Sequence, residues 1–285
     1  MPDTLPHYSL HAIYIMLLLV IAVATALVIP ARQIVPLGKE WDTLKNKEGF
    51  SDFSMSEFVY KNPKSEFADW DEDKRKRVYS RVRQITKKYG LAAFSVAVNK
   101  SHYDEIMPKA LKSRVGRHHY TWAVHHLLSF LSVWRFSGIA RPPFEYVFHW
   151  MEEPSSKADI EAAMERAEGA AAEAGVPGGY TNYSFRKSKE IPGLQCVDTI
   201  SWVCYQLAQF ALRDKPMHEF ATVGWEAFEG DRAEKGWLRA VTILPGDLRK
   251  WVEQVMADPS NLDGLQRLEE KLLARRSTSQ RSRST

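Results

Sequence analysis

The chain has 285 residues, of which 45% are hydrophobic, so it can bury a sizeable core and is not disordered overall. Its formal charge of +4 equals the charge of the four arginines in its last twelve residues, ARRSTSQRSRST, which contain no acid. The rest of the chain is therefore close to neutral, which argues against a broad nucleic-acid surface but allows a narrow cleft. The only two cysteines, Cys196 and Cys204, argue against a disulfide-stapled secreted protein and suit buried thiols in a reducing compartment.

The N-terminal part of the chain is apolar, and residues 12–30 carry no charge. As a helix, these residues would cover about 28 Å, close to the hydrocarbon thickness of a bilayer. Only Asp3 is charged before Arg32, whereas several bases follow, so the positive-inside rule puts the later residues in the cytoplasm. The sequence favours a single membrane span through residues 12–30 with the folded domain in the cytoplasm. The alternative is that residues 22–30, AVATALVIP, form a buried parallel strand of a cytoplasmic protein.

Helices and short apolar strands alternate along the rest of the chain. Residues 36–49 predict a short helix ending at Gly49, and residues 52–58 a brief extended piece. Residues 71–89 predict a helix with acids first and bases last, as the helix dipole favours, and Gly90 follows at the C′ position. The later elements are expected in this order: a buried strand at 91–99, an apolar helix at 118–136, a strand at 144–151, an Ala/Glu-rich helix at 156–175, a strand at 180–185, a long buried helix at 193–212, and amphipathic helices at 248–256 and 264–276.

This order predicts an α/β fold with a mixed or mainly parallel sheet flanked by helices, in one domain over residues 32–274. The apolar segment, 1–31, precedes this domain, and a disordered basic tail, 275–285, follows it. The helix at 71–89 has eight bases and no acid between Lys74 and Lys88, and forms either a solvated face or a phosphate-contacting face. The tail is either a solvated end or a contact for an acidic partner or lipid headgroups.

Several common catalytic motifs are missing from the sequence. It contains no P-loop, no G-x-G-x-x-G, no H-E-x-x-H and no G-x-S-x-G, so nucleotide hydrolysis, dinucleotide binding, zinc peptidase and esterase activity lose their usual support. The histidine pairs at 118–119 and 125–126 have no carboxylate or cysteine at ligand spacing, which favours packing or surface roles over a metal site.

Asp198 is the most informative single residue. It is the sole charge between Glu190 and Arg213, within the apolar stretch GLQCVDTISWVCYQLAQFAL. An ionised carboxylate is costly in such surroundings unless it is paired or bound to a cation. Two interpretations remain open, a functional carboxylate and a structural cap or ion pair.

An ordered set of short segments resembles the domain-of-unknown-function family numbered 3800, whose members look like relatives of the ribonuclease H-like superfamily. The most specific piece is the G-L-Q-x-x-D stretch. The matching pieces are Trp41, FSMSEF (residues 53–58), FADW (67–70), FSVAV (94–98), Tyr103, YVFHW (146–150) and GLQCVDTISW (193–202).

The resemblance implies carboxylates from the first strand, a central strand and a late helix that hold one or two divalent ions, Mg²⁺ or Mn²⁺, for phosphodiester cleavage. Asp198 matches the late-helix acid. Where the central-strand acid is expected, this chain has His149, with Glu152 and Glu153 just beyond. Glu57 is a further candidate. The implied catalytic residues are therefore Asp198, Glu57, His149 and Glu152, and the implied metal ligands are Asp198 and Glu152.

The first strand departs most from the family pattern. Members open with a strand that ends in Asp-x-Ser-Gly, and this chain has no such tetrapeptide. The apolar opening stretch stands where the first two strands of the family fall. We therefore expect a degenerate or weak metal-dependent nuclease-like domain, with nucleic acid as its possible partner. The alternative is a membrane-tethered, non-catalytic interaction module on the same scaffold.

Overall fold

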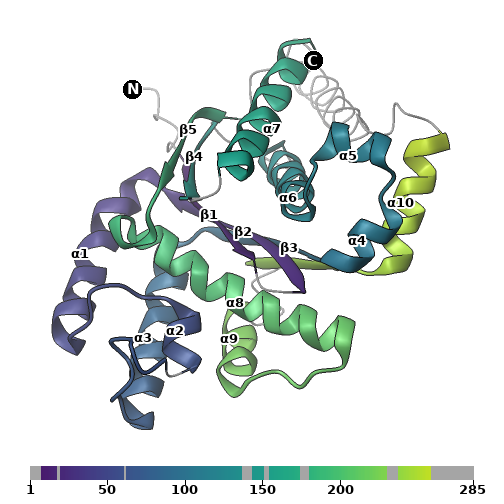
Figure 1. The fold of residues 1–285 in the computed structure, drawn as a ribbon. Helices are drawn as coiled ribbons and strands as arrows, with labels where there is room; N and C mark the ends of the chain where they lie inside the picture. The colour runs from purple at the N-terminus through teal and green to yellow at the C-terminus, as the bar shows by residue number, and fades with distance from the viewer. Residues whose placement is uncertain are drawn as a thin grey trace, which may run out of the picture.

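The computed structural model describes residues 8–17, 20–60, 62–136, 143–150, 154–173, 180–229 and 237–257. Its centre is a six-stranded sheet in the order β5-β4-β1-β2-β3-β6 (Figure 1). The strands are β1 (Tyr8–Leu17), β2 (Ile21–Pro30), β3 (Ala92–Asn99), β4 (Phe144–His149), β5 (Tyr180–Arg186) and β6 (Leu238–Ile243). Strands β1, β2 and β3 form an antiparallel meander, β4 is parallel to β1 and to β5, and β6 is parallel to β3. The predicted class, an α/β fold with a mixed sheet flanked by helices, is confirmed.

Helices cover both faces of the sheet (Figure 1). One face carries α1 (Ala31–Glu48), α2 (Met55–Tyr60), α3 (Glu72–Tyr89), α8 (Pro192–Arg213) and α9 (Glu219–Glu229). The other carries α4 (Lys100–Ile106), α5 (Lys109–Val115), α6 (His119–Phe136), α7 (Pro154–Glu173) and α10 (Pro245–Ala257). A 3₁₀ turn, η1 (Ser188–Glu190), joins β5 to α8. We call these two sides the α8 face and the α6 face.

Strand β2 lies inside the sheet, and all ten of its residues are buried. Its larger side chains, such as Val23 and Leu27, belong to the core of the α8 face. Its alanines, among them Ala24 and Ala26, face α6, where large side chains such as Trp122 and Leu127 complete the core. A row of small residues on one side lets bulky helix side chains approach the strand closely, which keeps the interior densely packed.

The prediction of a membrane helix over residues 12–30 is corrected by these strands. Of that range, residues 12–17 belong to β1 and residues 21–30 to β2, and the two strands pair antiparallel. In the described part of the chain, no helix is both long enough and apolar enough to cross a bilayer. The alternative was right that residues 22–30 form a buried strand, but wrong about its direction, because β2 is antiparallel to both of its neighbours. Membrane attachment and cytoplasmic location both stay predictions.

Helix α3 follows its sequence signals closely. The Asp71 carboxylate caps it by accepting a hydrogen bond from Lys74 N at 2.7 Å, and the helix ends before Gly90 as predicted. Gly90 is not in the left-handed conformation, since its φ is −80°. Its lack of a side chain matters for packing instead, because a Cβ there would lie 2.6 Å from the Leu27 side chain and 2.8 Å from that of Trp237.

Residues 50–60 and 62–70 contribute a compact aromatic lobe on the α8 face, and the extended piece expected at residues 52–58 gives way to α2 from Met55 onward. Its rings make edge-on and tilted contacts with centroids about 5–6 Å apart. The lobe consists of the rings of Phe50, Phe53, Phe58, Phe67 and Trp70. Arg75 of α3 is buried beneath it, where its guanidinium donates to the carbonyl oxygens of Phe58, Phe67 and Trp70. A single cation thus satisfies three carbonyl groups of an irregular segment.

Candidate functional site

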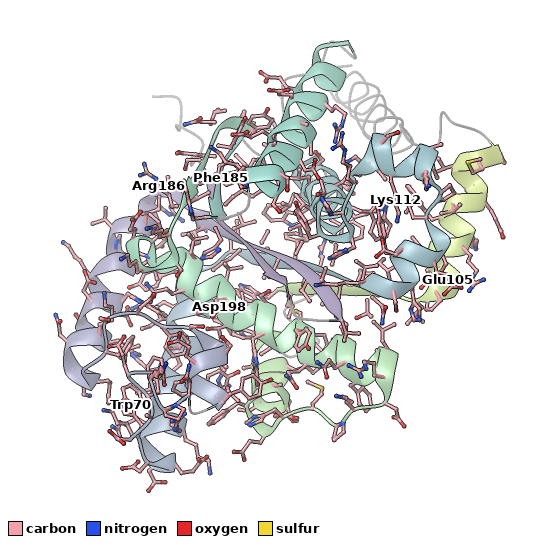
Figure 2. All side chains as sticks on the ribbon, in the orientation of Figure 1. Trp70, Glu105, Lys112, Phe185, Arg186 and Asp198 are labelled. Atoms are coloured by element: carbon pink, nitrogen blue, oxygen red, sulfur yellow. The ribbon has the colours of Figure 1, made fainter. Side chains whose placement is uncertain are left out.

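The predicted acid of the late helix, Asp198, lies on the first half of α8 (Figure 2). Its side chain is buried, with 2% of the residue exposed. Its Oδ2 atom accepts a hydrogen bond from Met55 N at 2.7 Å. Met55 is the first residue of α2, so its N–H has no partner within that helix. The Asp198 carboxylate therefore serves the start of α2, as a capping residue would, from 143 positions along the chain.

Gln195, three residues before Asp198, binds the same segment. Its Oε1 atom accepts hydrogen bonds from Phe53 N at 2.9 Å and from Trp41 Nε1 at 3.2 Å. Its Nε2 atom donates to Ser188 O in η1 at 3.1 Å. Residues three apart on a helix share a face, so the Gln and the Asp of the G-L-Q-x-x-D stretch both point at residues 51–55.

A third side chain, Glu66, completes the attachment of residues 51–55, which we call the anchored segment. Its two carboxylate oxygens accept from Ser51 N, Ser51 Oγ and Asp52 N at 2.7–3.1 Å. The backbone N–H groups of residues 51, 52, 53 and 55 thus all donate hydrogen bonds to side-chain oxygens of Glu66, Gln195 and Asp198. The anchored segment has little regular backbone pairing of its own, so these acceptors replace it.

The Asp52 side chain lies in the same region and is half-buried. Burial raises its pKa, and the nearby Glu66 carboxylate raises it further, while the hydrogen bond from Phe53 N and the charges of Lys45 and Lys189 oppose the shift. Asp52, Glu66 and Asp198 are thus three acids that surround the anchored segment. Each of the three accepts a backbone N–H, a stabilising role that leaves fewer oxygen lone pairs for a cation.

His149 ends β4, next to the β5 residue Arg186, with which it is paired across the strands. Side chains alternate along a strand, and Val147 packs in the core of the α8 face, so His149 points to that same side of the sheet as Asp198. Burial lowers the pKa of His149, which keeps its imidazole neutral at pH 7. Trp150 N donates to Arg186 O at 2.7 Å and closes this end of the two strands.

The described candidate Glu57 does not share the buried surroundings of Asp198. Glu57 lies in the first turn of α2 and is exposed to solvent. Glu152 and Glu153 lie outside the described residues. The sequence of β1, YSLHAIYIML, contains neither aspartate nor glutamate. Within the described ranges, no group of three or more His, Cys, Asp or Glu side chains is arranged to hold a metal ion.

The described donors fit Mg²⁺ or Mn²⁺ poorly. Mg²⁺ requires near-octahedral coordination by oxygen, and Mn²⁺ also prefers oxygen-rich sites. Here Asp198 directs one oxygen to a backbone N–H, and the expected position of the central-strand acid carries the imidazole of His149. The first strand adds no carboxylate. The described residues thus supply one carboxylate and one neutral imidazole, a small fraction of the ligand set that the resemblance implies.

The two cysteines match their predicted role as buried thiols. Cys196 and Cys204 are both free and buried, and burial raises the pKa of each to about 12. A thiol with so high a pKa carries almost no thiolate at neutral pH, so neither residue is an activated nucleophile.

Gln195, Glu66 and Asp52 were missed as site residues by the sequence reasoning. Only Gln195 had a usable signal, since it stands in the G-L-Q-x-x-D stretch, three residues before Asp198.

No family model, curated protein or solved structure matches this chain.

Proposed function

We propose that this chain is a ribonuclease H-like domain of the domain-of-unknown-function 3800 type, whose metal-dependent nuclease site is degenerate. Its first strand and β4 are neighbours and run parallel, and α8 packs across β1 and β2. The three elements that carry the family's carboxylates are therefore adjacent. This juxtaposition supports the proposed family, together with the G-L-Q-x-x-D stretch on α8.

The hydrogen bond from Met55 N to Asp198 carries the proposal that the site is degenerate. Among the described residues, the one acid at a family position holds the start of α2, while β1 lacks an acid and β4 ends in His149. Loss of carboxylate ligands lowers the affinity for a divalent ion steeply, because each supplies negative charge as well as an oxygen. We expect weak or absent phosphodiester cleavage.

A cleavage assay with labelled single-stranded and duplex DNA and RNA, in Mg²⁺ and in Mn²⁺, tests this proposal. The variant Asp198→Asn is the control, because its amide oxygen can still accept from Met55 N while the negative charge is lost. We expect the wild-type protein and the variant to cleave all of these substrates equally slowly or not at all. Robust metal-dependent cleavage that Asp198→Asn abolishes would show an intact site and overturn the proposal.

Titration of the protein with Mn²⁺, followed by calorimetry, gives a second measurement that does not depend on the choice of substrate. If the site is degenerate, the wild-type protein should not bind Mn²⁺ saturably in the micromolar range, and the Asp198→Asn variant should give the same result. Tight binding that depends on Asp198 would contradict the proposed loss of ligands even if no substrate is cleaved.

A further inference from the structure

A groove of about 490 Å³ lies between α1 and α3, on the outer side of the α8 face. Its walls carry Lys47 of α1 and Arg77 and Arg81 of α3, above two glutamates of α1, Glu40 and Glu48. The groove is separate from Asp198, which does not line it.

The glutamates hold the basic side chains in place. Arg77 binds Glu48 with two of its nitrogens, the shorter contact being 2.9 Å from Nη2 to Oε2. Arg81 and Lys88 share the two oxygens of Glu40. The hydrogen bonds to these carboxylates raise the pKa of Arg77 and of Lys88, so both remain cationic. Their side chains are thus fixed in position before any ligand arrives, which lowers the entropic cost of binding.

The cations and carboxylates differ sharply in their exposure to solvent. The side chains of Arg77, Arg81 and Lys88 are 48–58% exposed, whereas those of Glu40 and Glu48 are 15% and 6% exposed. A ligand approaching the groove therefore meets guanidinium and ammonium groups first, with the carboxylates beneath them. With Lys47, three cations line the groove against two recessed carboxylates, and Lys88, which does not line the groove, adds a fourth cation through its ion pair with Glu40.

The spacing of the cations along α3 suits a repeating anion. Positions 77, 81 and 88 lie on one side of the helix, and the first and last are about 16 Å apart along its axis at 1.5 Å per residue. A strand of duplex DNA carries one phosphate per roughly 3.4 Å of axis, so a row of this length can follow several consecutive phosphates.

The polar lining identifies the chemistry further. Thr43 and Ser80 also line the groove, and the Thr43 hydroxyl donates to Lys39 O at 2.8 Å, which leaves its oxygen lone pairs to accept. Arginine, lysine, serine and threonine are the side chains that commonly contact phosphate oxygens. Among the described residues that line the groove, none is aromatic, so it offers no ring for stacking on bases.

We propose that the α1–α3 groove binds the phosphodiester backbone of a nucleic acid without reading its bases. The basic face of α3 would then contact phosphate groups. This role does not depend on whether the Asp198 site can cleave. Recessed carboxylates that orient exposed guanidinium groups fit a regularly spaced polyanion better than an acidic protein surface, whose charges are irregular.

Fluorescence anisotropy with labelled 20-mers, in EDTA and at several salt concentrations, tests this inference independently of metal-dependent cleavage. The test variant is Lys47→Glu, which reverses an exposed charge of the groove and leaves both glutamates with their partners. The matched control is Lys109→Glu, which makes the same change in net charge at an exposed position of α5, on the α6 face.

We expect the wild-type protein to bind oligonucleotides of different sequence alike, with an affinity that falls steeply as salt rises. Lys47→Glu is expected to weaken binding about tenfold at low salt and to reduce the slope of log K against log salt by about 1, whereas Lys109→Glu leaves both unchanged. Arg81→Gln gives a second variant with a similar loss, since Lys88 and Tyr89 still bind Glu40. Equal effects of Lys47→Glu and Lys109→Glu, no binding by the wild type, or displacement of the oligonucleotide by polyglutamate at equal charge concentration would each overturn the inference.

Discussion

The Oδ2 atom of Asp198 lies 2.7 Å from Met55 N, and this hydrogen bond joins α8 to the first turn of α2. It explains how a lone carboxylate is tolerated within an apolar helix. Hydrogen bonds to a charged acceptor are stronger than neutral ones, and this one also satisfies an N–H that has no partner within its own helix. The residue therefore has a structural role that does not depend on any metal.

Replacing Asp198 separates this structural role from a catalytic one. Asp198→Ala removes the acceptor and leaves Met55 N buried without its partner, so we expect the free energy of unfolding to fall by about 2–3 kcal/mol. Asp198→Asn keeps an acceptor and should lose clearly less. Urea denaturation of both variants measures the difference. Equal losses in the two would mean that the charge matters and the hydrogen bond to Met55 does not.

Gln195 offers a related test, because it serves two donors at once. The near-isosteric change Gln195→Met leaves Trp41 Nε1 without an acceptor and Phe53 N with the Asp52 carboxylate alone, so we expect a loss of about 1–3 kcal/mol in the free energy of unfolding. Gln209→Met, on the same helix but partly exposed, should cost less than about 0.5 kcal/mol. Chemical denaturation compares the two variants, and similar costs would count against the role assigned to Gln195.

Arg75 is expected to be among the most sensitive positions of the chain. Arg75→Met leaves the carbonyl groups of Phe58, Phe67 and Trp70 without its guanidinium, so the free energy of unfolding should fall by about 3 kcal/mol or more. Arg75→Lys keeps the charge but lacks the planar fork, and should remain destabilised. Lys76→Met, at an exposed neighbouring position, is the control and should change stability by less than about 0.5 kcal/mol. A fully stable Arg75→Lys protein would show that the charge alone suffices.

The strongly patterned elements could be predicted from the sequence. Helix α3 has a capping aspartate, an apolar face and a dipole-matched charge order, all of which are local signals. Strand β3 is a continuous apolar run after a glycine, and it is buried along its whole length as expected. In such elements the local sequence favours the same structure as the tertiary contacts do, so the local pattern is enough to predict them.

Elements fixed by distant contacts could not be predicted in the same way. Residues 12–30 have the apolar composition of a membrane helix, and what makes residues 21–30 a strand is pairing with β1 on one edge and with β3 on the other. The start of α2 likewise depends on Asp198, far along the chain. For the candidate site, the sequence could indicate that a buried carboxylate needs a partner. It could not indicate which partner, because every residue except proline has a backbone N–H.

The α6 face holds a histidine whose protonation should weaken the fold. His126 lies against Trp122, with ring centroids 4.1 Å apart, and against Trp251 of α10 at 5.6 Å. Its Nε2 atom is buried and has no hydrogen-bond partner in the described part of the chain. Burial, together with the neighbouring His125, lowers the pKa of His126 to about 3, and burial together with the charge of Arg166 lowers the pKa of His125 to about 4.

The sign of the pH effect follows from these lowered values. In the unfolded chain both imidazoles take up protons near pH 6.5, whereas in the folded protein they stay neutral down to about pH 3–4. The unfolded state therefore binds more protons in between, and stability should fall as the pH drops from 6.5 towards 4. We expect urea denaturation of His126→Phe to show a shallower fall over this range, by up to about 1.4 kcal/mol per pH unit, with little loss at pH 7.5 because the ring is replaced by one of similar size. His118→Phe is the control, since His118 is half-exposed and faces Asp159 at 3.9 Å. If wild type and His126→Phe lose stability in parallel from pH 6.5 to 4, the proton uptake that opposes folding arises elsewhere in the chain.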